Sequence, residues 1–249
     1  MLPTPSTSHI DPSRIYEPAE DSYLLLDTLS SSSETAFMQQ RFPPKTPCPL
    51  VLEVGTGSGV VVAFVNAHAK HIFGRTDVAT LGTDVNSFAC KGAAQTVNLA
   101  ATESGNAGVL LDVVLGDLAS SLNPGSVDVL IFNPPYVPTE ELPSQPVSVA
   151  DEQDLDRNAQ FERDSHLLSL SYAGGVDGME TTNRLLGQIP QVLSLRGVAY
   201  VLLCKQNKPR EVVEQIQAWP GSWNAEIVGS SGKQAGWEKL CVVRIWRVS

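Results

Sequence analysis

The chain has 249 residues, of which 42% are apolar and 18% charged, and its formal net charge is −10. This length suits one α/β domain with a good core, or two small domains. The acidic balance argues against a protein that tracks nucleic-acid phosphates over a broad basic surface, although a local basic groove stays compatible with it.

No apolar run approaches the roughly 20 residues of a membrane-spanning helix, and the first residues lack the charged-then-apolar order of a signal peptide. The four cysteines, Cys48, Cys90, Cys204 and Cys241, are scattered without the paired spacing of a metal site. Three of them lie in apolar or helical surroundings, where a buried reduced thiol is expected. We therefore expect a reduced, soluble, intracellular protein with no metal site of its own.

The beginning of the chain divides into a tail and a helix. Residues 1–13, rich in Pro, Ser and Thr, predict a disordered tail, and a single domain is expected over 14–249. Proline and acids then precede an apolar stripe over 23–29, as is typical of a helix start. The polar first turn is open to two interpretations, a plain surface helix or a wall that lines a ligand. Residues 30–48 predict a loop, which completes an N-terminal helix-and-loop region over 14–48.

A strand over 50–54 runs into a glycine-rich turn and then into a helix expected over 60–73. Strand, glycine turn and helix together form a nucleotide-binding βα unit. A dinucleotide fingerprint requires glycine at position 60, where this chain has Val60. Glu53 on the strand would repel a pyrophosphate and attract an ammonium group, so the motif favours a zwitterionic cofactor without phosphates. The glycines of the turn are Gly55, Gly57 and Gly59.

The next two strands each end in an acidic residue. The strand over 78–83 is followed by Asp84, whose carboxylate can accept hydrogen bonds from both hydroxyls of a ribose, and which can also cap the next helix. The strand over 109–115 is followed by Asp117 and Leu118. An aspartate at that position can hold an adenine amine while the leucine covers the ring.

The sequence Asn133-Pro134-Pro135-Tyr136 follows an apolar run over 127–132 that predicts a buried parallel strand. Ligands of open α/β sheets bind at the carboxyl ends of such strands. Two prolines stiffen the loop and remove two backbone donors, so its carbonyls and the Asn133 side-chain oxygen lack local partners. With the flat face of Tyr136, the loop favours a planar group that bears NH2, an amide or a nucleobase amine. The structural alternative is an ordinary strand-ending turn.

The rest of the chain predicts an acidic insertion followed by a regular α/β pattern. The insertion over 138–165 is either a solvated loop or a lid that contacts substrate. After it we expect a second glycine cluster at 174–178, a helix over 180–193, a strand over 198–204, a helix over 209–219, and two final strands over 223–228 and 239–246.

These motifs occur in the order of the class I S-adenosylmethionine-dependent methyltransferases, and Asn-Pro-Pro-Tyr resembles the signature of the branch that methylates planar nitrogen. The segments over 16–22, 53–59, 173–178 and 234–240 are similar to the eukaryotic HemK-like release-factor glutamine methyltransferases. The resemblance covers nearly the whole chain from Ile15 onward. It implies a Rossmann-like α/β fold, a seven-stranded sheet that is mostly parallel with an antiparallel last strand, and helices on both faces.

The resemblance also implies a reaction, N5-methylation of the glutamine in the Gly-Gly-Gln motif of the translation termination factor, with S-adenosylmethionine as cofactor. The expected location is the cytoplasm, with the nucleus as the alternative. Transfer would be in line, with Asn133 and the Pro134 carbonyl orienting the amide and no covalent intermediate. The residues expected at the cofactor are Tyr16, Glu20, Ser22, Glu53, Gly55, Gly57, Asp84, Asn86, Asp117, Leu118 and Asn133. Those expected at the reaction are Asn133, Pro134 and Tyr136.

The strand over 109–115 would lie at one edge of the class I sheet. It is almost wholly apolar, whereas edges are normally blunted by charge, bulges or proline. We therefore expect either the chain's own loops or a partner that adds a strand to cover it. The resemblance points to a heterodimer with the small zinc-binding activator subunit shared by several eukaryotic methyltransferases.

Two other functions remain open at this point. A nucleic-acid adenine methyltransferase would share the loop over 133–136, called the receptor loop below. The acidic charge and the lack of a visible base-recognition domain count against it. A cofactor-binding scaffold without catalysis would have no need of the Asn133 loop.

Overall fold

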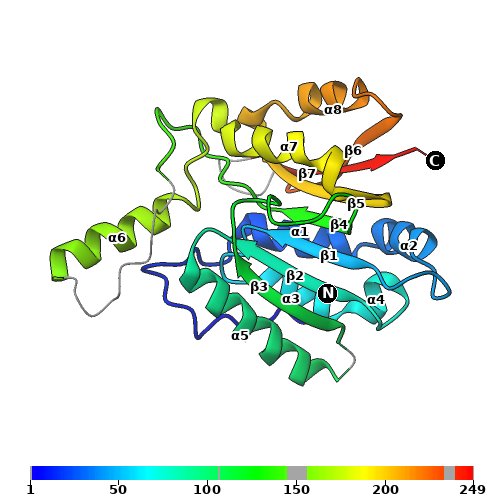
Figure 1. Cartoon of the computed structure of the whole chain (residues 1–249), viewed down its shortest axis with the longest axis horizontal. Coiled ribbons are helices and arrows are strands. Elements are labelled where there is room, and N and C mark those ends of the chain that lie inside the picture. The colour runs from blue at the N-terminus through cyan, green and yellow to red at the C-terminus, as the bar shows by residue number, and fades with distance from the viewer. Residues whose placement is uncertain (1, 106, 145–155, 233–238, 249) are drawn as a thin grey trace.

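The computed structural model describes residues 2–105, 107–144, 156–232 and 239–248. In these residues seven strands form one sheet in the order β3-β2-β1-β4-β5-β7-β6, and β7 runs antiparallel to both of its neighbours. The predicted sheet, mostly parallel with an antiparallel last strand, is therefore confirmed (Figure 1). The strands are β1 (Leu50–Val54), β2 (Ala79–Asp84), β3 (Val109–Leu115), β4 (Val127–Phe132), β5 (Leu193–Cys204), β6 (Trp223–Ser230) and β7 (Leu240–Arg247).

Helices cover both faces of the sheet, as expected (Figure 1). Two of them pack on one face, α7 (Glu180–Val192) and α8 (Pro209–Gln217). The other face carries α1 (Glu20–Ser30), α2 (Ser32–Arg41), α3 (Val60–Ala67), α4 (Ala69–Phe73) and α5 (Ser87–Ser104), and an eighth helix is α6 (Arg157–Ser169).

The central strands bury both of their faces, which is why they read as continuous apolar runs. All six residues of β4 are buried. Successive side chains of a strand point to opposite faces, so Leu130 and Phe132 pack toward α7 and α8, while Val129 and Ile131 pack toward α1–α4. The chain leaves β1 toward β2 and β3 and returns to β4 on the other side of β1. This reversal creates the crevice in which open α/β sheets bind ligands, at the carboxyl ends of β1 and β4.

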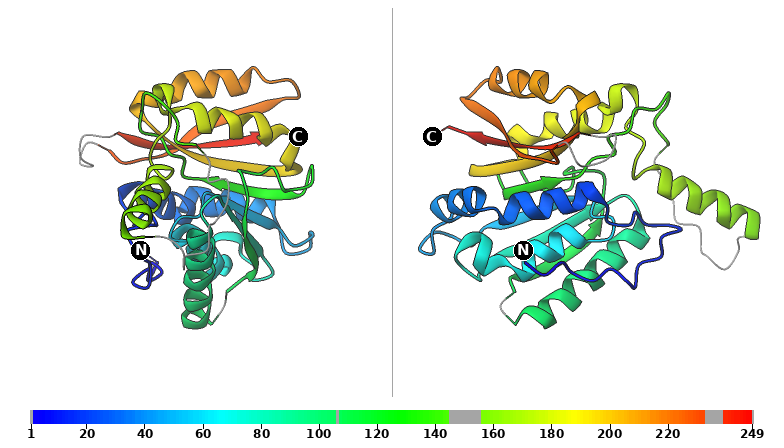
Figure 2. Two further views of the ribbon diagram at one scale, coloured as in Figure 1. Left: turned by 60° about the vertical axis from the view of Figure 1, so that its left-hand side comes forward. Right: turned by 180° about the vertical axis from the view of Figure 1, so that it is seen from behind.

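The N-terminal segment differs from the expectation of a disordered tail. Residues 2–13 lack a regular helix or strand, yet they run along α3 and α5 (Figure 2). The Pro3 carbonyl lies 2.8 Å from Nε2 of His68, and Nε2 of His9 lies 3.2 Å from the carbonyl of Gly92. The absence of a side chain at Gly92 leaves space for Ile10.

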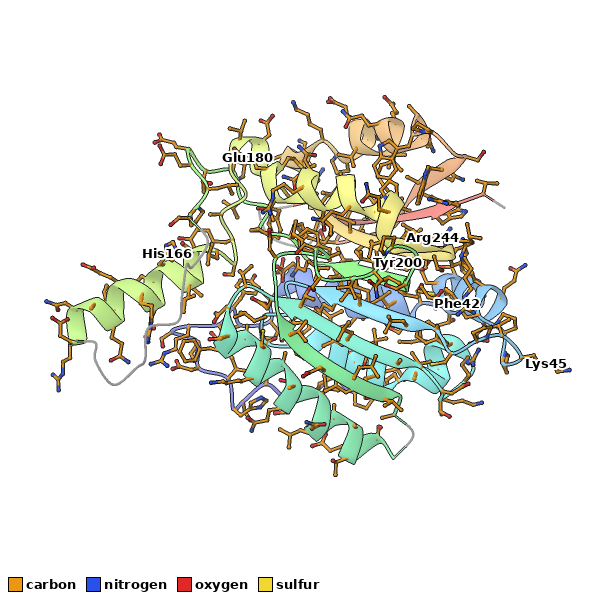
Figure 3. All side chains as sticks on the ribbon, in the orientation of Figure 1. Phe42, Lys45, His166, Glu180, Tyr200 and Arg244 are labelled. Carbon is orange, nitrogen blue, oxygen red and sulfur yellow. The ribbon has the colours of Figure 1, made fainter. Side chains whose placement is uncertain are left out.

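The predicted loop over 30–48 contains the helix α2, so this prediction was wrong. A buried polar cluster holds α2 on the sheet: Glu34 accepts from Arg244 at 2.9 Å and from the Tyr200 hydroxyl at 2.7 Å. The guanidinium of Arg244 also lies over the Phe37 ring, 4.0 Å from its centroid. Figure 3 shows Tyr200 and Arg244 close together near α2. A tertiary ion pair of this kind can stabilise a helix that is polar in sequence.

The helices differ from the predicted elements in two further places. The helix expected over 60–73 is divided at His68 into α3 and α4. The acidic insertion contains α6, which Asp156 caps by accepting from the Ala159 N–H at 2.8 Å, and which projects away from the sheet (Figures 1 and 2). Residues 145–155 of the insertion, and most of the segment over 234–240 that resembles the HemK-like methyltransferases, lie outside the described residues. In the part of the chain that the structure describes, no helix has the length and apolar character needed to cross a bilayer.

The close packing of the turn before α3 predicts that a side chain at Gly59 lowers stability far more than one at another left-handed glycine. A Cβ at Gly59 would lie 2.5 Å from Cα of Ala93, and Gly59 has φ +76°. We expect Gly59→Ala to lower the free energy of unfolding by about 3 kcal/mol, because strain and overpacking add. Gly105→Ala is the matched control, since φ is +65° there but no neighbour among the described residues lies within 4 Å of an added Cβ. Urea denaturation of both variants would test this, and equal losses would contradict the role of the close approach.

Candidate active site

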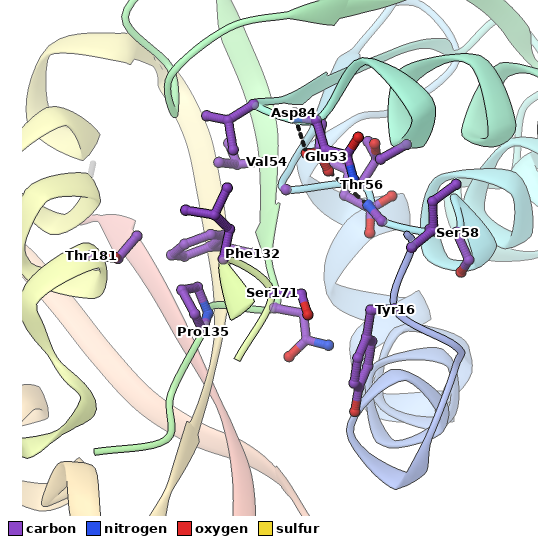
Figure 4. Close-up of a pocket in the computed structure, with 18 of the residues that line it drawn as sticks. Tyr16, Glu53, Val54, Thr56, Ser58, Asp84, Phe132, Pro135, Ser171 and Thr181 are labelled. Carbon is purple, nitrogen blue, oxygen red and sulfur yellow. Dashed lines mark hydrogen bonds between the residues drawn. The ribbon is translucent and has the colours of Figure 1, made fainter. Parts of the chain in front are cut away.

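A pocket opens at the carboxyl ends of β1, β2 and β4 (Figure 4). Its walls come from the N-terminal segment, the glycine turn, the strand-end loops, the insertion and α7. Of the residues predicted to bind the cofactor, all but Glu20 line it. They are Tyr16, Ser22, Glu53, Gly55, Gly57, Asp84, Asn86, Asp117, Leu118 and Asn133.

The glycine turn is fixed by bonds to neighbouring strands. The Gly55 N–H donates to the Thr83 carbonyl at 2.7 Å, and the Gly57 N–H donates to Oδ2 of Asp84 at 2.9 Å. Gly55 and Gly57 have φ of +65° and +50°, a backbone region that side-chain-bearing residues avoid. The turn therefore brings main chain, rather than side chains, against the ligand space.

Glu53 lies at the base of the turn and is 2% exposed. Its Oε2 accepts from the Val62 N–H, in the first turn of α3, at 2.8 Å. Burial raises the pKa of Glu53 well above its ordinary value; the Val62 bond opposes this, and the nearby Asp84 charge adds to it. An ammonium group or a hydroxyl placed here would stabilise the ionised carboxylate.

Asp84 occupies the end of β2 and accepts two backbone bonds, from Gly57 and from the Asn86 N–H at 2.8 Å. Burial raises the pKa of this carboxyl, and the two backbone bonds oppose the rise. The cap of α5 is Asn86, which accepts from the Phe88 N–H at 3.0 Å, so the expectation that Asp84 itself caps this helix was wrong. The Asn86 amide also donates to the Arg14 carbonyl at 2.8 Å and so ties the N-terminal segment to the pocket.

The acidic residue that the first turn of α1 contributes to the pocket wall is Asp21, not Glu20. Glu20 is exposed and does not line the pocket, whereas Asp21 is 3% exposed and lines it. Asp21 accepts from the Tyr16 hydroxyl at 3.1 Å and from the Ser22 N–H at 2.6 Å. One residue along a helix is a rotation of about 100°, so a motif read without the helix phase selects the wrong acid.

The receptor loop after β4 presents one strong feature, the side chain of Asn133. Its Oδ1 is buried on the pocket wall and has no hydrogen-bond partner among the residues that the structure describes. Buried acceptors are normally paired, and each unpaired one calls for an explanation. A ligand that donates an amide or amine N–H to Oδ1 of Asn133 would give this acceptor its missing partner.

The rest of that loop differs from the prediction. Pro135 lines the pocket, but Pro134 and Tyr136 do not, and Tyr136 packs against the core under α1–α4. The Tyr136 carbonyl accepts from Nδ2 of Asn207 at 3.2 Å. A Cβ at Gly178 would lie 2.0 Å from that carbonyl oxygen, so the second glycine cluster serves close packing against the receptor loop.

The donor set of the pocket fits a nucleoside with an ammonium group and no phosphates. Three carboxylates, Glu53, Asp84 and Asp117, face it from successive strand ends. The two arginines on its wall are paired with acids: Nε of Arg14 lies 3.1 Å from Asp164, and Arg184 binds Asp117. A pyrophosphate would meet mainly acids, whereas S-adenosylmethionine offers hydroxyls, an amine and a positive charge.

The fold and this donor set define a class I methyltransferase. No family model matches the chain. Over 255 residues, which is 100% of this chain and 97% of the relative, it is 31% identical to the eRF1 methyltransferase catalytic subunit mtq2 of Schizosaccharomyces pombe. It is 33% identical to methyltransferase HEMK2 of Mus musculus, over 98% of this chain and 96% of the relative.

Among solved structures, the N-terminal domain of human METTL16 in complex with SAH has a TM-score of 0.52 at 13% identity, over 96% of this chain and 75% of that one, which supports the fold. The full-length matches go further. The chain belongs to the family of mtq2 and HEMK2, the HemK-like methyltransferases, and S-adenosylmethionine is the methyl donor that its pocket fits.

The raised pKa of Glu53 predicts a pH-dependent effect of Glu53→Gln. A carboxyl whose folded pKa lies above its unfolded value loses stabilising free energy as pH rises from the unfolded value through the folded one. Without ligand, the variant should therefore be more stable than the wild type at pH 7, and the difference should shrink as pH falls toward 4.5.

Thermal unfolding from pH 4 to 8 would measure this difference. Asp27→Asn, which removes a carboxylate on the exposed face of α1, is the matched control. If the Glu53→Gln and wild-type stabilities ran parallel across this pH range, the raised pKa of Glu53 would be contradicted.

Proposed function

We propose that this methyltransferase transfers a methyl group from S-adenosylmethionine to the side-chain amide nitrogen of the glutamine in the Gly-Gly-Gln motif of the translation termination factor, in the cytoplasm. The observation that carries the proposal is the Oδ1 of Asn133, which is buried on the pocket wall and finds no hydrogen-bond partner in the described part of the chain. Membership of the family whose relative is named an eRF1 methyltransferase supports the protein substrate.

The cofactor supplies an electrophilic methyl group on a sulfonium centre. Glu53 and Asp21 would provide acceptors for its ammonium end, Asp84 for its ribose and Asp117 for its adenine amine, while Leu118 would cover the adenine ring. The glycine turn lets the cofactor approach the main chain closely.

Asn133 then performs two tasks. Its Oδ1 accepts one N–H of the substrate amide, which fixes the direction of the nitrogen lone pair. The same bond strengthens as positive charge develops on that nitrogen, so it stabilises the transition state more than the bound substrate. No strong base is required, because the amide nitrogen becomes acidic once it is methylated. Pro134 is buried and does not line the pocket, so the structure gives no support to the expected role of its carbonyl.

Asn133→Ala should retain cofactor binding and lose turnover by about 100-fold or more, because the orienting and charge-stabilising acceptor is removed. Transfer of labelled methyl groups to the termination factor would measure turnover, and calorimetry with S-adenosylhomocysteine would measure binding. A substrate whose Gly-Gly-Gln glutamine is changed to asparagine is the matched control. Full turnover by the variant would contradict the mechanism, and label on DNA instead of the factor would favour the adenine alternative.

We also propose that a zinc-binding activator subunit covers the edge strand β3. In the described sheet β3 lies at the edge, with Val109, Leu111 and Leu115 60%, 57% and 58% exposed. The edge is partly blunted, because its pairing with β2 has a register shift between Leu110 and Asp112. The three apolar side chains stay open to solvent nonetheless, and such a strip is typical of a protein interface.

Leu111→Glu should weaken the complex with the activator subunit by about tenfold or more, since it places a charge in an apolar contact. Leu195→Glu is the matched control, because Leu195 is 83% exposed on β5, a different strand of the sheet. Titration of labelled activator with each variant would measure the two dissociation constants. An unchanged constant for Leu111→Glu would place the partner elsewhere.

A further inference from the structure

The loop after β3 is held in a conformation that needs support. Leu118 has φ +53°, in the left-handed backbone region that is unfavourable for a leucine. It is buried, and its carbonyl accepts from the Thr83 hydroxyl at 2.9 Å. The loop therefore keeps Asp117 and Leu118 at the pocket only while the surrounding structure holds it.

Helix α7 supplies that support from one of its faces. Arg184 and Gln188 are four residues apart and so lie one above the other on the helix. Oε1 of Gln188 accepts from the Ala119 N–H at 3.0 Å, and the guanidinium of Arg184 binds Oδ2 of Asp117. The helix itself is immobilised, because Leu185 and Ile189 are buried in the core that also includes Leu118.

The two contacts act on different parts of the loop. Gln188 binds the backbone beyond Leu118 and so holds the loop as a whole. Arg184 binds the carboxylate of Asp117, and no described residue donates to the other oxygen, Oδ1. Both Asp117 and Arg184 line the pocket, so this second oxygen is left for a donor on the ligand.

We propose that Arg184 is a positioning residue for recognition of the adenine amine, acting through Asp117. This rests on the proposed use of S-adenosylmethionine. A carboxylate on a freely rotating side chain loses rotamer entropy when it binds a donor. The ion pair with Arg184 fixes the side chain beforehand, so Oδ1 meets the amine without that cost, and the chain distinguishes an amino purine from an oxo purine.

The test compares two ligands on each variant by calorimetry: S-adenosylhomocysteine, and S-inosylhomocysteine, in which a carbonyl oxygen replaces the amine. Arg184→Gln should bind S-adenosylhomocysteine about tenfold more weakly and the inosyl analogue within twofold of the wild type. Arg184→Lys should restore part of the preference, because an ammonium keeps the charge but not the planar fork.

Two further variants separate positioning from structural support. Gln188→Ala should weaken both ligands, since it loosens the backbone that places Leu118 against either purine. Asn183→Ala, on an exposed position of α7, should change neither. Equal losses of both ligands in Arg184→Gln would overturn the proposal. Failure of the wild type to bind S-adenosylhomocysteine would instead overturn the cofactor assignment, so the two failures are distinguishable.

Discussion

The site depends on two buried carboxylates that satisfy backbone N–H groups. Glu53 holds the first turn of α3, and Asp84 holds Gly57 in the glycine turn. Burial alone would make both groups costly when ionised, and these bonds offset part of that cost. The residues that shape the turn are therefore the same ones that face the ligand. Local folding and cofactor recognition cannot be changed independently here.

Most of the sheet could be predicted from sequence because its strands are buried on both faces, which leaves short apolar runs such as 127–132. The helix α2 could not, since the contacts that fix it on the sheet include the ion pair of Glu34 with an arginine 210 positions later in the chain. No local pattern carries that information. The N-terminal segment was missed for the same reason: its partners, His68 between α3 and α4 and Gly92 on α5, are distant in sequence.

Within the site, strand-end residues such as Asp84 and Asn133 could be placed at the pocket from sequence, because the end of a strand is visible there and its direction is fixed. Residues on helices were less accessible to prediction. Choosing Asp21 over Glu20 requires the rotational phase of α1, and Arg184 belongs to a helix whose sequence contains no recognised motif. The inward packing of Tyr136 follows from its contacts with the core and with Asn207, which only the folded chain brings together.

The position of β7 bears on synthesis. It follows every other strand in sequence, yet it lies between β5 and β6, and Val242, Val243 and Ile245 on it are wholly buried. A growing polypeptide therefore cannot complete its core until residues 240–247 have left the ribosomal tunnel. Until then β5 and β6 present apolar surface with no strand between them, which is the kind of intermediate that chaperones bind.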